Sequence, residues 1–405
     1  MTEWKDKARK STEKIAPFGA DLDLSAYNRK VREWEKTPLS NLSDDLKKKA
    51  LLTGISSNEE LRCGSYFQLD HSVVFAGVKK QFEGKVEIMS TKEAMQQYDW
   101  VKNYWWNAVP VDSDKYTAEA ELQWDNGYFI RILPNQKVTF PLQACLFLSQ
   151  EGISQNVHNL IIVEEGSDVQ IITGCTSSAR RALHIGVSEF YVKKNARLTF
   201  TMIHRWMPEI DVRPRAVAIV EDNATFTSNY ICLNPVRSLQ LYPTAKCIGN
   251  NSSASLNSII LGAGEAEIDV GGRVLLKGTN SSGYVVSRCV AKERSKIHAR
   301  GQIIGEGEAT KAHIDCRGLI VSEGAEIHAI PVLDGITKDC ELSHEAAVGK
   351  IKEEELWYLR SRGLREEDAT SLIIKGYLNP GIFGLPGDLE KEIKRVVDVT
   401  VEETM

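Results

Sequence analysis

The sequence predicts a mainly β protein, with a right-handed parallel β-helix core, a mixed α/β N-terminal region and a C-terminal helical segment. Three observations support this fold class. From about residue 159, helical spacing disappears and β-type alternation takes over. A turn-and-strand figure then recurs about every 28–30 residues, and helical patterns return after Ser343. We therefore divide the chain into an N-terminal region 1–158, a β-helix core 159–342 and a helical region 343–405.

The N-terminal region mixes helical and strand patterns. We expect helices over Ser43–Leu52 and Ser90–Trp106, and the second begins with Ser-Thr-Lys-Glu, the pattern of a capping box. Short apolar runs between and after them predict strands over Ser72–Val78, Phe129–Leu133 and Gln143–Leu148.

The core contains a weak internal repeat. Small or polar turn residues precede an apolar strand start at Val169, Leu198, Phe226, Leu256, Ile297 and Ile327. The spacing is regular except between Leu256 and Ile297, where the period holds only if Gly264–Ile268 starts a further partial unit. Strands with Gly and Asn turns at this period favour stacked β-helix coils over a long curled sandwich. Leucine-rich and ankyrin solenoids would need a helix in each repeat, and no such pattern is visible.

Helical patterns fill the C-terminal region. We expect one helix over Ile351–Arg362 that ends at Gly363, and another over Arg365–Lys375 that ends at Gly376. An amphipathic stretch, Asp388–Val399, follows. Such a tail either caps the last coil or docks a partner.

Composition excludes several classes of function. The chain has 405 residues, 42% hydrophobic and 26% charged, and a net charge of −5, so nucleic acid is not expected as a main partner. No apolar stretch approaches the roughly 20 residues of a membrane span. The charged N-terminal run lacks the apolar core of a signal peptide, so we expect a cytoplasmic protein with reduced cysteines.

Common catalytic motifs are absent from the sequence. Without a P-loop, any requirement for ATP must be met by another chain. A β-helix enzyme acting on polysaccharide would need paired carboxylates in a groove, for which Asp269, Glu265 and Glu267 are candidates by residue type alone. A purely structural protein without a ligand is a third alternative.

Cysteines and histidines gather late in the chain. Five of the eight cysteines lie between Cys232 and Cys340, and none forms a CxxC pair. Thiolates and imidazoles on neighbouring strands suit soft metals and iron–sulfur clusters, and a thiolate can also accept sulfur. The late group comprises Cys289, Cys316, Cys340, His298, His313, His328 and Ser343-His344-Glu345.

A series of short segments identifies a family between about Arg62 and Tyr377. In order, they are Gly64-Ser65-Tyr66-Phe67-Gln68, His71-Ser72-Val73-Val74, Pro141-Leu142-Gln143-Ala144, Glu164-Glu165-Gly166-Ser167, Gly174-Cys175-Thr176, Leu241-Tyr242-Pro243, Cys316, Ser343-His344-Glu345-Ala346 and Arg362-Gly363-Leu364-Arg365-Glu366-Glu367-Asp368-Ala369. In this order and spacing they resemble the SufB/SufD family, scaffold components of the SUF iron–sulfur cluster assembly system. The family fold, a β-helix with a helical tail, agrees with the pattern-based prediction.

The resemblance implies a set of cluster ligands. Cys316 looks like the family's late β-helix cysteine, implicated in holding the nascent cluster, and we expect its thiol to face the surface. His344 and Glu345 look like the SufB His-Glu pair proposed to complete the site, and we expect them at a helix start beyond the last coil. Cys289, Cys247 and Cys232 rank below these three, because their separations approximate one coil and half a coil. Cys340 is a reserve ligand, and we assign Cys63, Cys145 and Cys175 to packing.

Three features depart from the SufB pattern. Ser343 stands where SufB usually has Glu, as in SufD, and no cysteine lies near Arg215–Asp222, where bacterial SufB carries its sulfur-entry thiol. The long N-terminal region of larger SufB proteins is also shortened. These departures indicate a compact form that serves the roles of both SufB and SufD.

The function implied by the resemblance is a non-enzymatic scaffold. It would pair with itself or with a SufB/SufD paralogue through residues Cys289 to Leu333, and would build a transiently bound [4Fe-4S] cluster at that interface for apo acceptor proteins. A SufC-like ATPase would dock on the tail, Glu345 to Val399. Three residues are expected inside the anchor helix of this tail, namely Leu372, Ile373 and Ile374. ATP-driven closure of that partner would distort the interface and expose buried ligands.

Overall fold

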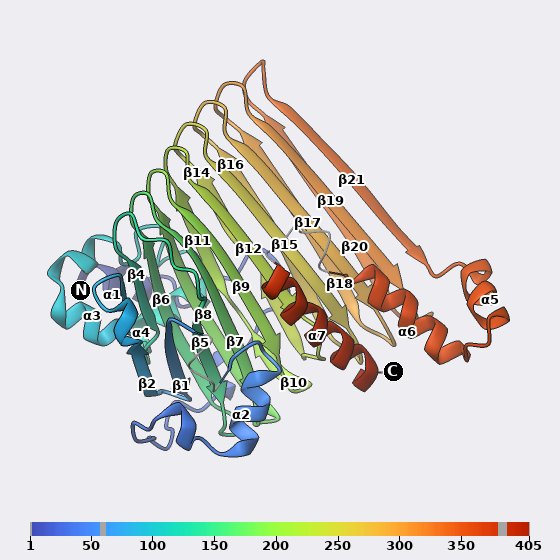
Figure 1. Ribbon diagram of the computed structural model, residues 1–405, viewed down its shortest axis with the longest axis horizontal. Coiled ribbons are helices and arrows are strands. Elements are labelled where there is room, and N and C mark those ends of the chain that lie inside the picture. Colours follow the sequence, from blue (N-terminus) through green and yellow to red (C-terminus); the bar gives the residue numbers. More distant parts are fainter. Residues whose placement is uncertain (1, 57–61, 380–386, 405) are drawn as a thin grey trace.

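Two long, mostly parallel sheets stacked face to face make up most of the molecule (Figure 1). The computed structural model describes residues 2–56, 62–379 and 387–404. Each coil of the chain places one strand in the first sheet and then returns to place a strand in the second. The predicted mainly β solenoid is therefore confirmed as a flattened β-helix, and its right-handed sense stays a prediction.

Within the described residues, sheet I is a ladder of ten strands in which only β1 and β2 pair antiparallel. The expected strands at Ser72–Val78 and Gln143–Leu148 match two of its members within one residue. The order in the sheet is β2 (Ser72–Val78), β1 (Gly64–Leu69), β5 (Leu142–Leu148), β7 (Asp168–Ser177), β9 (Arg197–Arg205), β12 (Thr225–Cys232), β15 (Ser253–Gly262), β17 (Ser282–Ala291), β19 (Lys311–Ile320) and β21 (Glu341–Lys350).

Sheet II runs beside it, and two of its coils are interrupted. Pro214 and Pro243 each lie between two short strands, because proline has no backbone N–H to donate to the ladder. The order is β3 (Val86–Ser90), β4 (Tyr128–Ile132), β6 (Ser154–Val163), β8 (Arg181–Val192), β10 (Glu209–Val212) with β11 (Arg215–Val220), β13 (Ser238–Leu241) with β14 (Thr244–Cys247), β16 (Glu267–Leu276), β18 (Lys296–Gly305) and β20 (Glu326–Gly335). Among the strands that the structure describes in this sheet, only β3 and β4 pair antiparallel, and β4 confirms the strand expected at Phe129–Leu133.

Helices cover the outer faces of both sheets, and the main hydrophobic core lies between the sheets (Figure 1). The outer face of sheet II lies under an N-terminal layer that includes α1 (Thr2–Arg9), α3 (Thr91–Gln97) and α4 (Lys115–Leu122). Sheet I is covered by α2 (Asp44–Leu51), α6 (Glu366–Tyr377) and α7 (Gly387–Thr404), while α5 (Glu353–Ser361) extends past the last strand. Short 3-10 helices lie at Leu24–Ala26, Leu39–Asn41, Lys80–Phe82 and Asp99–Asn103. No helix in the described ranges is long and apolar enough to cross a membrane.

The turns that lead into sheet I repeat one backbone conformation. Asn195, Asn223, Asn251 and Asn280 all have positive φ, at 28 or 29 residue intervals, a conformation that asparagine tolerates better than most residues. Their side chains form a ladder in which each amide Nδ2 donates to the Oδ1 of the residue one coil before, at 3.1, 3.1 and 2.7 Å. These turns hold successive coils in register.

The break in the sequence repeat has a topological cause. Val169, Leu198 and Phe226 lie at one level of sheet I, but the residue at that level on the next strand is Ala254, two positions before Leu256. Ile268, Ile297 and Ile327 lie at one level of sheet II. The repeat markers therefore switch from one sheet to the other, and the extra unit expected at Gly264–Ile268 is the turn into β16.

Three expected helices have different bounds in the structure. The capping box at Ser90 is present, but α3 ends at Gln97 and a separate 3-10 helix follows, because Tyr98 is extended. Gly363 has the positive φ expected after a helix, whereas Gly376 lies inside α6. The helical region begins at Glu353, not near Ser343, because residues up to Lys350 form the last strand. The expected helices at Ser43–Leu52 and Asp388–Val399 are present as α2 and α7.

The ladder of turn asparagines yields a stability prediction. Asn223→Ala should lower the free energy of unfolding by about 1–2 kcal/mol, because alanine is strained at φ +54° and cannot replace the two amide hydrogen bonds. Asn223→Gly should cost less, since glycine accepts this backbone conformation. Denaturant unfolding measures both. Equal stability of the alanine variant and the unmodified chain would contradict this role of the turn.

Candidate functional site

The strands at the C-terminal end of the solenoid present two chemically different faces. On β19, Ile314 and Cys316 point into the core between the sheets, while Asp315 and Arg317 point outward, as period-two alternation requires. Parallel pairing keeps the same face on the neighbouring strands. Inner and outer residues of these coils therefore have different chemical neighbours.

Cys316 is an interior residue, which corrects the expectation of a surface-facing thiol. Its side chain is 1% exposed, and it lies opposite Ser287 on β17 and Ala346 on β21. Burial raises the pKa of the thiol to about 11, against the opposing effect of the Ser287 hydroxyl. Only one strand, β21, separates Cys316 from the end of the stack.

His344 and Glu345 lie in β21 and not at a helix start. His344 is opposite Ile314 and therefore shares the inner face with Cys316. Glu345 is opposite Asp315 on the outer face, where its carboxylate lies 3.4 Å from Arg317. The structure thus brings His344 to the face that carries Cys316 and separates Glu345 from both.

Of the lower-ranked cysteines, only Cys289 lies near Cys316. It points inward from the adjacent strand, two positions along from Ser287, and burial raises its pKa further than that of Cys316. Cys232 lies three strands from β19, about 14 Å at the usual strand spacing. Cys247 belongs to β14 in the other sheet, and burial raises the pKa of both Cys232 and Cys247 to about 12.

The described part of one chain does not form a complete metal site. No group of three or more His, Cys, Asp or Glu side chains in it is arranged to hold a metal ion. The cysteines assigned to packing are fully buried, namely Cys63, Cys145 and Cys175. Cys340 is half-buried in a turn, where its thiol donates to the Thr337 carbonyl oxygen at 3.2 Å.

The other late histidines lie on outer faces and do not join Cys316. His298 and His328 stack on sheet II with ring centroids 4.9 Å apart, and His313 contacts the Ser343 hydroxyl at 2.8 Å on sheet I. Two of the three carboxylates considered for a polysaccharide enzyme are bound to arginines. Asp269 accepts two hydrogen bonds from Arg300 at 2.6 and 2.9 Å. Glu265 is ion-paired with Arg294.

An ion-pair chain lies directly behind the candidate cysteines. Arg288 contacts Asp315 at 2.5 Å, and Arg317 contacts it at 3.0 Å. Burial opposes ionisation of Asp315, but the two guanidinium groups outweigh it and hold its pKa below the ordinary value. The chain continues to Glu345 and so ties the last three strands of sheet I together on their outer side.

The two ends of the solenoid differ in how their last strands pair. At the N-terminal end the edge strands β2 and β3 pair antiparallel with one neighbour each, and a loop lies against β2, where the Thr37 backbone N–H donates to the Val74 carbonyl oxygen. At the other end, β20 pairs only with β18, and β21 only with β19, within the described residues. Their free edges carry partly exposed apolar side chains, including Val332 and Val348, each 41% exposed. An open strand edge with apolar neighbours is a template for pairing with another chain.

The tail presents a second apolar surface, which includes only Leu372 of the three residues expected in the anchor. Ile374 is 1% exposed and packs against the outer face of sheet I, and Ile373 is partly buried there. Leu372 faces solvent, as do Trp357 and Tyr358 on α5, which are 70% and 58% exposed. None of the described residues of α5 is buried. The anchor expected at Ile373 and Ile374 is therefore part of the core, and the exposed aromatic pair was missed.

Sequence reasoning also missed two serines inside the solenoid: Ser287, which lies opposite Cys316, and Ser258, which lies opposite Ser287 one strand further from it. The same strands also carry Ser253, Ser255 and Ser282, and the signal that distinguishes Ser258 and Ser287 is that alternation turns these two inward.

Comparison with known proteins places these features in a family. The family model "SUF system FeS cluster assembly, SufBD core domain" matches residues 146–377. An iron–sulfur cluster assembly SufBD family protein of Methanothermobacter thermautotrophicus strain Delta H is 43% identical over 404 residues, 98% of each chain. One from Archaeoglobus fulgidus is 46% identical over 354 residues, 87% of this chain and 94% of the relative. One from Staphylococcus aureus strain MRSA252 is 30% identical over 405 residues, 95% of this chain and 85% of the relative.

Proposed function

The chain belongs to the SufBD family of iron–sulfur cluster assembly proteins, and from this premise we propose that it is a non-enzymatic scaffold that builds a cluster between its open end and a second SufBD chain. The second chain is a copy of itself or a paralogue. The cluster is the cargo of this scaffold, held transiently and then passed to apo acceptor proteins.

One observation carries the proposal. Cys316 and His344 share the inner face of the last two strands of sheet I, at an end of the stack that has unpaired edges. A thiolate and an imidazole are both ligands of iron–sulfur clusters. Cys289 adds a third sulfur one strand further in.

A second chain would complete the ligand set. One chain offers Cys316 and His344 near its end but no group of three ligands among its described residues. Two open ends facing each other would bring two cysteines and two histidines together, which is enough for the four ligands of a [4Fe-4S] cluster. Glu345 is a weaker candidate in this arrangement, because it faces outward and is paired with Arg317.

Burial suits a transient site. A cluster enclosed between two open ends would be protected from water, and release would require the ends to separate. A partner can drive that separation only through a difference in affinity for the closed and open states. A SufC-like ATPase on α5 and α6 is the partner we propose, because α5 follows β21 directly and presents Trp357 and Tyr358 to solvent.

The ligand proposal predicts a contrast between two buried cysteines. After anaerobic reconstitution, Cys316→Ala should lose most bound iron and sulfide, whereas Cys247→Ala should keep them, because Cys247 lies in the other sheet away from the open end. Both thiols are buried in the same core, so each substitution should destabilise the fold by a similar small amount. Iron analysis and visible absorbance measure the effect. Equal iron content in the two variants would rule out the Cys316 assignment.

The pairing proposal predicts that one charge at the open end prevents association. Val348→Asp should produce a monomer at micromolar concentration, because it places a carboxylate on the inner row of the last strand. Ile248→Asp is the matched control, since Ile248 is comparably exposed (46%) but precedes β15, well away from the free edges. Sedimentation velocity distinguishes the states. A monomeric unmodified chain that also fails to pair with a paralogue would contradict the proposal.

The docking proposal predicts that the exposed aromatic pair carries partner binding. Replacing Trp357 and Tyr358 together with Ala should reduce affinity for a SufC-like ATPase by at least tenfold while the fold remains intact, because α5 buries none of its described residues. Ile15→Asp, at an exposed N-terminal position, serves as the control. Titration calorimetry measures both. Unchanged affinity of the double variant would place the ATPase elsewhere.

A further inference from the structure

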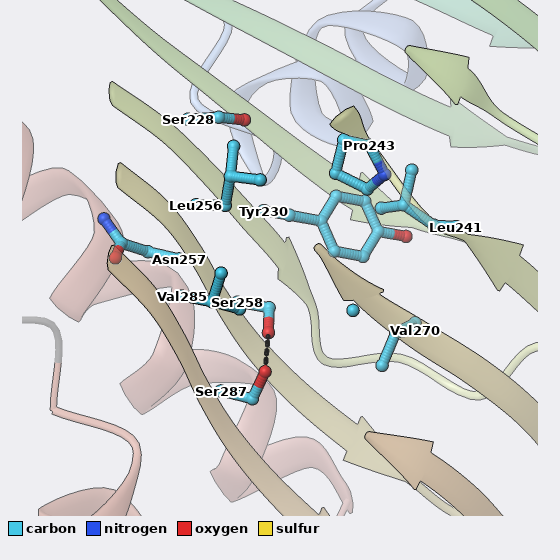
Figure 2. A pocket seen from close by; sticks show the side chains of 11 residues that line it. Ser228, Tyr230, Leu241, Pro243, Leu256, Asn257, Ser258, Val270, Val285 and Ser287 are labelled. Carbon is cyan, nitrogen blue, oxygen red and sulfur yellow. Dashed lines mark hydrogen bonds between the residues drawn. The ribbon is translucent and has the colours of Figure 1, made fainter. Parts of the chain in front are cut away.

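A row of polar side chains on the inner face of sheet I ends at Cys316. Tyr230, Ser258, Ser287 and Cys316 occupy the same level of four successive strands of sheet I, and each lies opposite the next. Figure 2 shows the two serines beside each other at the edge of a narrow cavity, with Tyr230 on its far side. The cavity is otherwise lined mainly by apolar side chains, among them Leu241 and Val270.

The two serine hydroxyls are buried and connected. Ser287 is 1% exposed and Ser258 is 7% exposed. The Ser258 hydroxyl donates to the Ser287 oxygen at 3.0 Å, the dashed contact in Figure 2. Ser287 lies opposite Cys316 in the ladder register, which places its hydroxyl on the same inner face as the thiol. The hydroxyl opposes the rise that burial causes in the pKa of the Cys316 thiol.

Folding alone gives little reason for hydroxyls at these positions. Burying a hydroxyl costs free energy unless it has a partner, and replacing two mutually bonded polar groups with apolar ones is often nearly neutral. Here the two serines bond to each other, so the core can bury them at little cost in stability but gains little stability from them. Their effect is instead on the chemistry of one cysteine, because they place a hydrogen-bond donor beside its sulfur.

We propose that Ser287 is a positioning residue for Cys316: its hydroxyl donates a hydrogen bond to the sulfur when that sulfur binds metal, and Ser258 holds Ser287 in the required orientation. This inference rests on the proposed function, which makes Cys316 a ligand. Donors beside a metal-bound ligand fix its orientation and strengthen binding, and hydrogen bonds to cluster sulfurs tune the reduction potential. The serine pair would thus prepare the sulfur from inside the coil, on the side away from the second chain.

The test uses Co²⁺ alone as the probe, titrated anaerobically into the apo full-length chain and followed by sulfur-to-metal charge-transfer absorption. Ser287→Ala should weaken Co²⁺ binding about 10–100-fold, the usual effect of removing an outer partner of a ligand. Ser287→Thr keeps the hydroxyl and should bind nearly as well as the unmodified chain. Ser258→Ala should weaken binding in the same direction but by less, because it acts only through Ser287.

Ser281→Ala is the matched control. Ser281 is as buried as Ser287, and its hydroxyl donates to the Gly278 carbonyl oxygen at 2.7 Å. It lies in a turn and is not part of the row of polar side chains that ends at Cys316. It should leave Co²⁺ affinity unchanged. A reconstituted chain offers an independent readout, since Ser287→Ala should also make the reduction potential of its cluster more negative and Ser287→Thr should restore it.

The outcomes separate this inference from the proposed function. If Cys316→Ala abolishes the charge-transfer band while Ser287→Ala and Ser258→Ala bind Co²⁺ like the unmodified chain, the positioning role is wrong and the ligand assignment stands. If Ser281→Ala weakens binding as much as Ser287→Ala, the effect is general loss of packing and the positioning role is also wrong. If Cys316→Ala leaves the band unchanged, the ligand assignment fails and the inference fails with it.

Discussion

Hydrogen bonding between successive coils is the constraint on which this structure depends. Nearly every strand satisfies its backbone groups through the coil before it and the coil after it, so no coil is stable by itself. The register is kept by turns of one conformation, with asparagines at positive φ that bond to one another from coil to coil. Because pairing is parallel and in register, an inward-facing residue lies opposite an inward-facing residue on the next strand, and an outward-facing residue lies opposite an outward-facing one. The side chains therefore form continuous inner and outer rows across the coils.

The same constraint shapes the end of the stack that carries the candidate ligands. A stack of coils must terminate twice, and here it ends in antiparallel strands on the N-terminal side and in the parallel strands β20 and β21 on the other, which pair on one side only within the described residues. Cys316 and His344 occupy the inner row at that free end, and the ion pairs of Arg288, Asp315 and Arg317 brace the outer row of the same strands. Cys316 is thus a buried thiol with a single strand, β21, between it and the end of the stack.

Much of the fold could be predicted from the sequence, because alternation and turn residues are local signals. The alternation around Leu198 identified strands, and the turn before β16 was expected from Gly264–Ile268. The last strand was not recognised, since Glu345-Ala346-Ala347 favours a helix locally and only pairing with β19 makes it a strand. That error placed His344 and Glu345 together, whereas alternation in a strand puts them on opposite faces. The position of Ser287 opposite Cys316 comes from strand pairing between residues far apart in the sequence, and no local pattern reports it or the exposure of Trp357.

The central claim is that the cluster lies between two chains and belongs to neither alone. Native mass spectrometry of the anaerobically reconstituted protein tests it most directly, because it reports chain number and cluster mass in the same ion. The account predicts that the cluster mass appears on a species of two SufBD chains, with one cluster per pair, and that separated single chains carry none. A cluster retained on single chains, or one cluster for each chain of a pair, would contradict it.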